Sequence, residues 1–188
     1  MKKLIYIFVL LLLSTHSYGQ QFELTPMGLV DKSNSTKDYI VIRFPGKSQQ
    51  ELFNKTKAYI TSIYNSAKDV MSVSEPDLIS TFGVSKFVYK RKISLAVKCV
   101  LKHKVTIAFK EGRARVQFEI IDIFPEDPQV KNKIKLCGNS MNTGGIFNKE
   151  GEVKAPISKK EIEDSANIFA QELANYINEK NDNVEEDW

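Results

Sequence analysis

The clearest pattern in this chain is an alternation of apolar and polar residues that runs from Ile93 to Ile123. Apolar residues take nearly every second position on both sides of Glu111-Gly112, and six lysines or arginines lie between them. A period of two is typical of strands in a sheet with one buried and one solvated face, and Glu-Gly suits a tight turn. The pattern therefore predicts a β-hairpin. The residues expected to face the core are Leu95, Val97, Cys99, Leu101, Val105, Ile107, Phe109, Ala114, Val116, Phe118 and Ile120.

Apolar residues at helical spacing predict two amphipathic helices, one over 48–65 and one over 157–180. The first has the apolar stripe Leu52, Thr56, Tyr59, Ile60 and Ile63, and the second has Ile162, Ala166, Phe169, Leu173, Tyr176 and Ile177. Ser158 and Glu161 are spaced as a capping box, which predicts that the second helix begins there.

The other segments are shorter. Residues 20–38 are mixed and predict one short strand followed by a loop. Further extended segments are expected at 39–44, at 69–73 and at 78–92, the last broken near Gly83. The segments therefore predict one α+β domain, because two amphipathic helices can cover the apolar face of an antiparallel sheet and leave the lysines in water. The sheet and first helix should occupy 20–123, followed by an irregular segment at 124–156, the helix at 157–180 and an acidic tail at 181–188.

The first 19 residues have the layout of a secretory signal peptide. Lys2 and Lys3 precede an apolar run of ten residues, Leu4–Leu13, and small or polar residues follow it. The run is well short of the ~20 residues of a membrane-spanning helix. We therefore expect cleavage near Gly19-Gln20, a secreted or periplasmic protein, and no transmembrane segment after cleavage. No cysteine lies near the cut, so a lipoprotein signal is not supported.

The stretch YIVIRFPGKSQQEL, residues 39–52, places Gly-Lys-Ser between a strand pattern and a helix pattern. A phosphate-binding loop needs G-x-x-x-x-G-K-[ST], because its first glycine lets the backbone wrap around the phosphates. Val41 occupies the position of that glycine, so no nucleotide is expected. Instead, Pro45-Gly46 ends the strand, and Ser48 and Glu51 form a capping box for the helix.

Charge is unevenly distributed along the chain. The whole sequence has a net charge of +4, but residues 86–115 contain ten lysines or arginines and a single acid, Glu111. Most of these basic residues should share the solvated face of the sheet: Lys86, Lys90, Lys92, Lys98, Lys102, Lys104, Lys110, Arg113 and Arg115. This face could bind an acidic glycan, a lipid headgroup, an acidic protein or nucleic acid. The simpler interpretation, which we favour, is that lysines on the solvated face keep the sheet soluble and discourage edge pairing. Few aromatic residues accompany them, so nucleic acid is the least expected of these partners.

No catalytic motif, metal site or cofactor site is predicted. Cys99 and His103 resemble a nucleophile and its base, but four residues along a strand separate them by about 13 Å at ~3.3 Å per residue. Proton transfer needs a distance of ~3 Å. The two cysteines, Cys99 and Cys137, could form a disulfide in an oxidising compartment, or Cys99 could remain a buried free thiol.

Three motifs together resemble a known family. They are Gly46-Lys47-Ser48 at a helix start, Lys68-Asp69-Val70 in a strand, and Lys110-Glu111-Gly112-Arg113 with Arg115 at a hairpin turn. Over residues 39–123 the chain resembles the secreted bacterial domain of unknown function described as having a TATA-binding-protein-like fold. The chain has Tyr59 where that family often has tryptophan, and Gly83 alone in a strand that is usually glycine-rich. The resemblance implies a curved antiparallel sheet with helices on one side, and it implies no catalytic residues.

The sequence therefore predicts a secreted or periplasmic, non-enzymatic module. We expect it to bind a ligand or protein partner through the solvated sheet face or through 124–156. Two alternatives remain open. One is a binder of anionic polymers or lipid headgroups on the basic face, and the other is a hydrolase whose site is assembled only in three dimensions.

Overall fold

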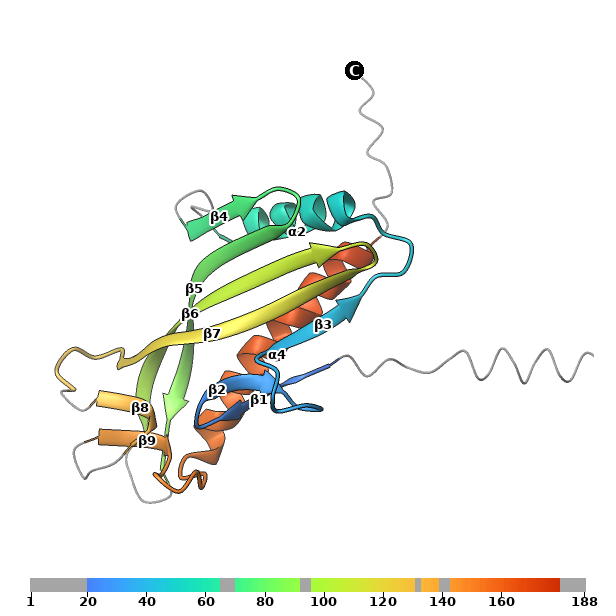
Figure 1. Cartoon of the computed structure of the whole chain (residues 1–188). Coiled ribbons are helices and arrows are strands. Elements are labelled where there is room, and N and C mark those ends of the chain that lie inside the picture. The colour runs from blue at the N-terminus through green and yellow to red at the C-terminus, as the bar shows by residue number, and fades with distance from the viewer. Residues whose placement is uncertain (1–19, 65–69, 92–95, 131–132, 139–142, 180–188) are drawn as a thin grey trace, which may run out of the picture.

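The computed structural model describes residues 20–64, 70–91, 96–130, 133–138 and 143–179. The expected signal peptide and acidic tail lie outside these residues. In chain order the elements are β1 (Phe22–Thr25), β2 (Gly28–Asp31), β3 (Tyr39–Arg43), α2 (Gln49–Ile63), β4 (Met71–Ser74), β5 (Leu78–Tyr89), β6 (Val97–Lys110), β7 (Arg113–Pro125), β8 (Lys133–Cys137), β9 (Thr143–Phe147) and α4 (Pro156–Asn178) (Figure 1).

The main sheet has five strands in the order β3-β7-β6-β5-β4, and every neighbouring pair is antiparallel. The long β6–β7 hairpin at its centre confirms the strongest sequence prediction. Its turn uses Gly112 at φ +68°, a backbone conformation that glycine adopts at little cost. Ile121 is the extra residue of a bulge, because Lys102 pairs with Asp122 and His103 with Ile120. The fold is α+β, as expected.

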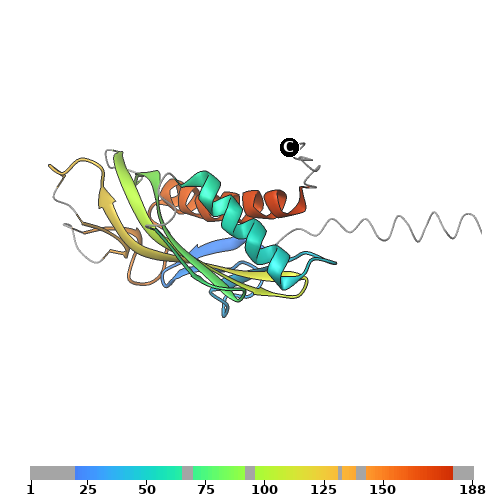
Figure 2. The same cartoon turned by 90° about the horizontal axis from the view of Figure 1, so that it is seen from above.

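Both helices lie on the same side of the sheet, and the long strands bend toward them (Figure 2). Helix α2 carries the chain from the edge strand β3 to the opposite edge strand β4. Ser48 is its N-cap, with Ser48 Oγ accepting a hydrogen bond from the backbone N–H of Glu51 at 3.1 Å. The two helices meet through the ring of Tyr59, whose centroid lies 5.9 Å from that of Phe169 and 5.4 Å from that of Tyr176.

The expected capping box of α4 is wrong. The helix begins earlier, at Pro156, with Ala155 as N-cap and no side-chain capping bond. Ser158 is fully buried, and its hydroxyl donates to the carbonyl of Val88 at 3.0 Å and accepts from the N–H of Lys90 at 3.1 Å. Glu161 accepts from the N–H of Val88 at 2.6 Å. Both side chains therefore bind β5 instead of their own helix.

The first described segment is more ordered than the sequence predicted. Strands β1 and β2 form an antiparallel hairpin, where one short strand and a loop were expected. Side chains of α4 bind the backbone of β1: Asn167 accepts from the N–H of Phe22 at 2.8 Å, and Glu163 accepts from the N–H of Leu24 at 2.8 Å. The hairpin thus depends on residues more than 130 positions away, which explains why local sequence did not reveal it.

The segment 124–156, expected to be mostly irregular, contains two strands. Strand β7 also extends to Pro125, and β8 pairs with β9 in parallel. Both strands are five residues long, and Gly144 and Gly145 lie in β9. Two glycines in a five-residue strand leave little alternation of apolar and polar residues, so the sequence did not predict β9 or its pairing with β8.

Strand β5 runs without a break through Gly83, where an interruption was expected. A β-carbon at this position would lie 2.5 Å from the hydroxyl of Tyr64 and 2.6 Å from Nε2 of His103. The glycine is therefore needed to make room for the partly buried Tyr64 and the buried His103.

Candidate anion-binding site on the outer face of the sheet

The outer face is the side of the main sheet that points away from the helices. Near the β6–β7 turn, three adjacent strands each place a basic residue on it: Arg43 pairs with Arg113, and Arg113 pairs with Lys110. Arg115 lies two residues further along β7, on the same face. We call Arg43, Lys110, Arg113 and Arg115 the cation cluster. All four are exposed.

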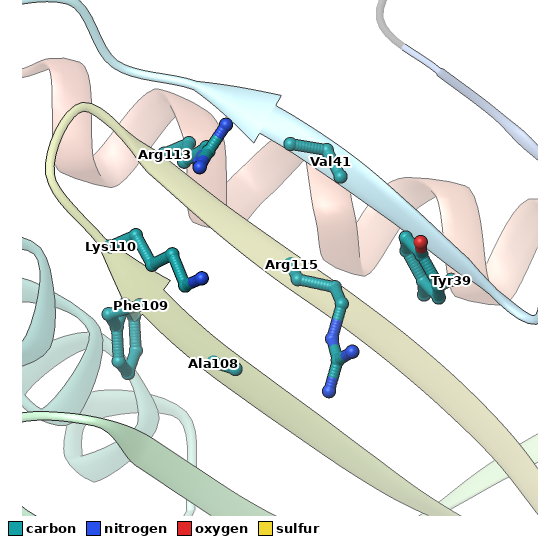
Figure 3. Close-up of a pocket in the computed structure, with 7 residues that line it drawn as sticks. All are labelled: Tyr39, Val41, Ala108, Phe109, Lys110, Arg113 and Arg115. Carbon is teal, nitrogen blue, oxygen red and sulfur yellow. The ribbon is translucent and has the colours of Figure 1, made fainter.

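A pocket of about 370 Å³ opens beside this cluster. Its lining residues are Tyr39, Val41, Ala108, Phe109, Lys110, Arg113 and Arg115 (Figure 3). Lys110 and Arg115 extend toward Ala108. The guanidinium carbon of Arg115 also lies 5.1 Å from the ring centroid of Tyr39, which is within the range of a cation–π contact. The pocket therefore combines fixed positive charge with an apolar floor.

No member of the cation cluster has a carboxylate partner within 4 Å among the described residues. The nearest acid in sequence, Glu111, has its carboxylate at the N-terminus of α2, where it accepts from the N–H of Gln49 at 3.1 Å. Like charges opposite each other on neighbouring strands are destabilising. The cluster is thus a concentration of positive charge that the described fold leaves unneutralised.

The rest of the predicted basic face carries acidic as well as basic side chains, which the sequence alone did not indicate. Acidic residues of β7 lie beside its lysines, since Lys104 pairs with Glu119 and Lys102 with Asp122. Lys102 and Lys104 also lie over aromatic rings, 5.3 Å from Phe124 and 5.9 Å from Phe82 respectively. These acids follow directly after the basic window at 86–115, so a charge count along the chain did not include them.

The remaining predicted basic residues do not join the cluster. Lys86 forms an ion pair with Glu126 at 2.5 Å, and this hydrogen bond lowers the pKa of the Glu126 carboxyl. Lys90 follows the end of β5, and Lys98 lies near the start of β6, opposite Val88. Lys92 lies outside the described residues. In contrast, Arg43 was not predicted to belong to this face, and only its register with Arg113 brings it into the cluster.

Cys99 and His103 both point into the core. Burial raises the pKa of the Cys99 thiol to about 11 and lowers the pKa of the His103 imidazole to about 4. The His103 ring stacks on Phe118 with centroids 4.4 Å apart. At neutral pH both groups are uncharged, so they do not form an activated nucleophile and base. Cys99 is a buried free thiol and Cys137 an exposed one, so the possible disulfide between them is not formed in this structure.

The Gly-Lys-Ser stretch serves the start of α2. Lys47 Nζ donates to a carboxylate oxygen of Glu51 at 2.6 Å, and this bond lowers the pKa of Glu51. Together with the Ser48 cap, it accounts for the motif as a helix start. Within the described ranges, no three or more His, Cys, Asp or Glu side chains are grouped as a metal site. Nor does any helix of those ranges have the length and hydropathy needed to cross a bilayer.

A curved antiparallel sheet with two helices on one side places the domain in the TBP-like fold class. A family model described as a domain of unknown function (DUF4468) with TBP-like fold matches residues 39–123. The match confirms, over these residues, the resemblance inferred from the sequence motifs. The matched range contains all four residues of the cation cluster.

Two solved structures are similar to the chain. A DUF4468 family protein from Bacteroides ovatus is 13% identical, with a TM-score of 0.49 over 77% of this chain and 87% of that chain. A TBP-like protein from Parabacteroides distasonis is 17% identical, with a TM-score of 0.46 over 74% of this chain and 90% of that chain. No curated protein matches the chain.

Proposed function

We propose that this protein is a non-enzymatic binding module that recognises an anionic ligand or partner at the cation cluster. One observation carries the proposal: four basic side chains from three adjacent strands lie together, three of them line a pocket, and none has a carboxylate within 4 Å among the described residues. Arginine is suited to this role, because its planar guanidinium can bond a carboxylate, sulfate or phosphate through two parallel hydrogen bonds.

The proposal narrows the expected binding surface. On the outer face, Lys102 and Lys104 have acidic cross-strand neighbours, and Lys86 is ion-paired, so these lysines offer less unneutralised charge. The part of the face nearest the β6–β7 turn is therefore the favoured site. The segment 124–156 contributes none of the residues that line this pocket.

Retention at low salt on a cation exchanger that presents short sulfopropyl groups tests the proposal. We expect the wild-type protein to bind and the Arg113→Glu/Arg115→Glu variant to lose retention. The Lys102→Glu/Lys104→Glu variant is a matched control, because it changes the net charge equally on the same face and should still be retained. Equal loss in both variants, or no retention of the wild-type protein, would contradict the proposed site.

We also propose that the protein acts outside the cytoplasm after removal of residues 1–19. The basic start and the apolar run Leu4–Leu13 support export. Gln20, the first residue after the expected cut, accepts a hydrogen bond from the N–H of Val41 at 2.5 Å, so cleavage after Gly19 keeps this contact. N-terminal sequencing of the exported protein should find Gln20 first. An intact Met1 on the exported protein would contradict cleavage.

A further inference from the structure

The pocket beside the cation cluster has an apolar floor, which recognition of charge alone does not require. Tyr39 and Val41 come from β3, and Ala108 comes from β6. All three share the outer face with the basic residues that form the rim (Figure 3). Pockets for small organic molecules typically have volumes of roughly 300–1,000 Å³, mostly apolar walls and a few charged or polar groups that fix orientation. The volume of about 370 Å³ is at the lower end of that range.

We propose that this pocket binds a small amphiphilic anion: an organic carboxylate, sulfate or phosphate ester with a compact apolar body. The inference rests on the proposed anion-binding function and specifies its ligand class. The charged head group would accept hydrogen bonds from Lys110, Arg113 and Arg115. The apolar body would cover Val41, Ala108 and the ring of Tyr39.

The geometry of the rim suits a single head group. Lys110 and Arg113 are register partners on adjacent strands, and strands in a sheet are about 4.8 Å apart. A tetrahedral or planar anion can therefore accept from both side chains at once. The Tyr39 ring, 5.1 Å from the guanidinium carbon of Arg115, helps to hold that group in place before the ligand arrives.

The charges around the pocket favour a small ligand over a long polyanion. A linear polymer that followed β7 away from the cluster would meet Glu119 and then Asp122, which lie on the same face. These carboxylates would repel it, whereas a compact anion stays within reach of the cluster. The carboxylates along β7 thus favour a small ligand, and the apolar floor of the pocket favours one with an apolar body.

Isothermal titration calorimetry with three matched probes tests the inference. The probes are octyl sulfate below its micelle concentration, inorganic sulfate, and octyl glucoside, which has the same tail without the charge. We expect octyl sulfate to bind at least about tenfold more tightly than inorganic sulfate, because burying two or three methylene groups suffices for that factor. Octyl glucoside should show no saturable binding.

Two variants locate the binding. Val41→Ser should weaken octyl sulfate several-fold and leave inorganic sulfate unchanged, since only the floor is altered. Arg113→Gln/Arg115→Gln should abolish binding of both sulfates, whereas Lys102→Gln/Lys104→Gln should preserve it.

The contrary outcomes distinguish failure of the amphiphilic ligand class from failure of the proposed function. Equal affinities for octyl sulfate and inorganic sulfate would overturn the amphiphilic ligand and leave the proposed function intact. Saturable binding of octyl glucoside, or loss of octyl sulfate binding in the Lys102 and Lys104 variant alone, would also overturn it. If neither sulfate binds the wild-type protein, the proposed function fails with it.

Discussion

His103 is a buried titratable residue through which pH can act on the stability of this domain. The imidazole is buried under the helices, stacks on Phe118, and lies against Gly83, where a side chain would collide with it. Its Nδ1 has no hydrogen-bond partner among the described residues. The burial cost falls on the charged form, so the folded protein keeps this group neutral.

We expect acidification to destabilise the fold through His103. Its pKa falls from an ordinary value of 6.5 to about 4 on folding. Between these values the unfolded chain binds a proton that the folded protein does not, so the free energy of unfolding decreases as pH falls. The full contribution is about 3 kcal/mol, from 1.36 kcal/mol for each pKa unit.

Urea unfolding of the wild-type protein and of a His103→Leu variant at pH 7 and pH 4 checks this. The wild-type protein should lose about 3 kcal/mol more than the variant over that interval. Comparing the two proteins removes the contribution of the carboxylates, which they share. The same pH dependence in both proteins would show that His103 is not the titrating group.

At the scale of elements, side chains of α4 form hydrogen bonds with the backbone at the end of β5 and so fix the helix against the sheet. Ser158 bridges the carbonyl of Val88 and the N–H of Lys90 from a fully buried position. Ser158→Ala should lower the free energy of unfolding by about 1–3 kcal/mol, because it leaves buried backbone groups without partners. It should also speed hydrogen exchange at the Lys90 amide. Ile157→Ala, at the exposed neighbouring position, is the control and should change stability little. Equal effects of the two variants would contradict the bridge.

The row of like charges across β3, β7 and β6 should cost stability when no anion is bound. Arg113→Gln removes the middle charge and should raise the free energy of unfolding by roughly 0.2–1 kcal/mol at low salt. Added salt should reduce the difference, since it screens exposed charges. Thermal melts at low and high salt measure both effects. Lys104→Gln, next to Glu119, should give no such gain; a gain in both variants would point to net charge rather than to the row.

Sequence periodicity predicted the elements whose signal is local. The β6–β7 hairpin and α2 were expected with nearly correct bounds, because alternation, helical spacing and the Ser48 cap are all read within a few residues. The position of α4 was also recovered, but its beginning was assigned to the wrong residues. Ser158 and Glu161 have capping-box spacing, yet the nearby backbone of β5 provides their partners.

The candidate site was only partly predictable, because it depends on strand register. Lys110, Arg113 and Arg115 could be named from the hairpin alone. Arg43 enters the cluster through pairing between β3 and β7, which are neighbours in the sheet but far apart in the sequence. The register between β6 and β7 places Glu119 beside Lys104, so this part of the predicted face has less net positive charge. A count of charges along the sequence therefore could not show which lysines have acidic neighbours in the sheet.

At the scale of the whole molecule, the sheet separates two tasks. Its inner face packs against α2 and α4 and contains the buried residues of the core. Its outer face has an unneutralised cationic end near the β6–β7 turn and a mixed region beyond it. We propose that this cationic end is a binding site.

Titration of the isotopically labelled protein with inorganic sulfate at low ionic strength, followed by backbone amide chemical shifts, tests this claim most directly. We predict saturating shifts that are largest at Val41, Lys110, Arg113 and Arg115 and are lost in Arg113→Gln/Arg115→Gln. Shifts that never saturate, or that centre on Lys102 and Lys104, would contradict the claim.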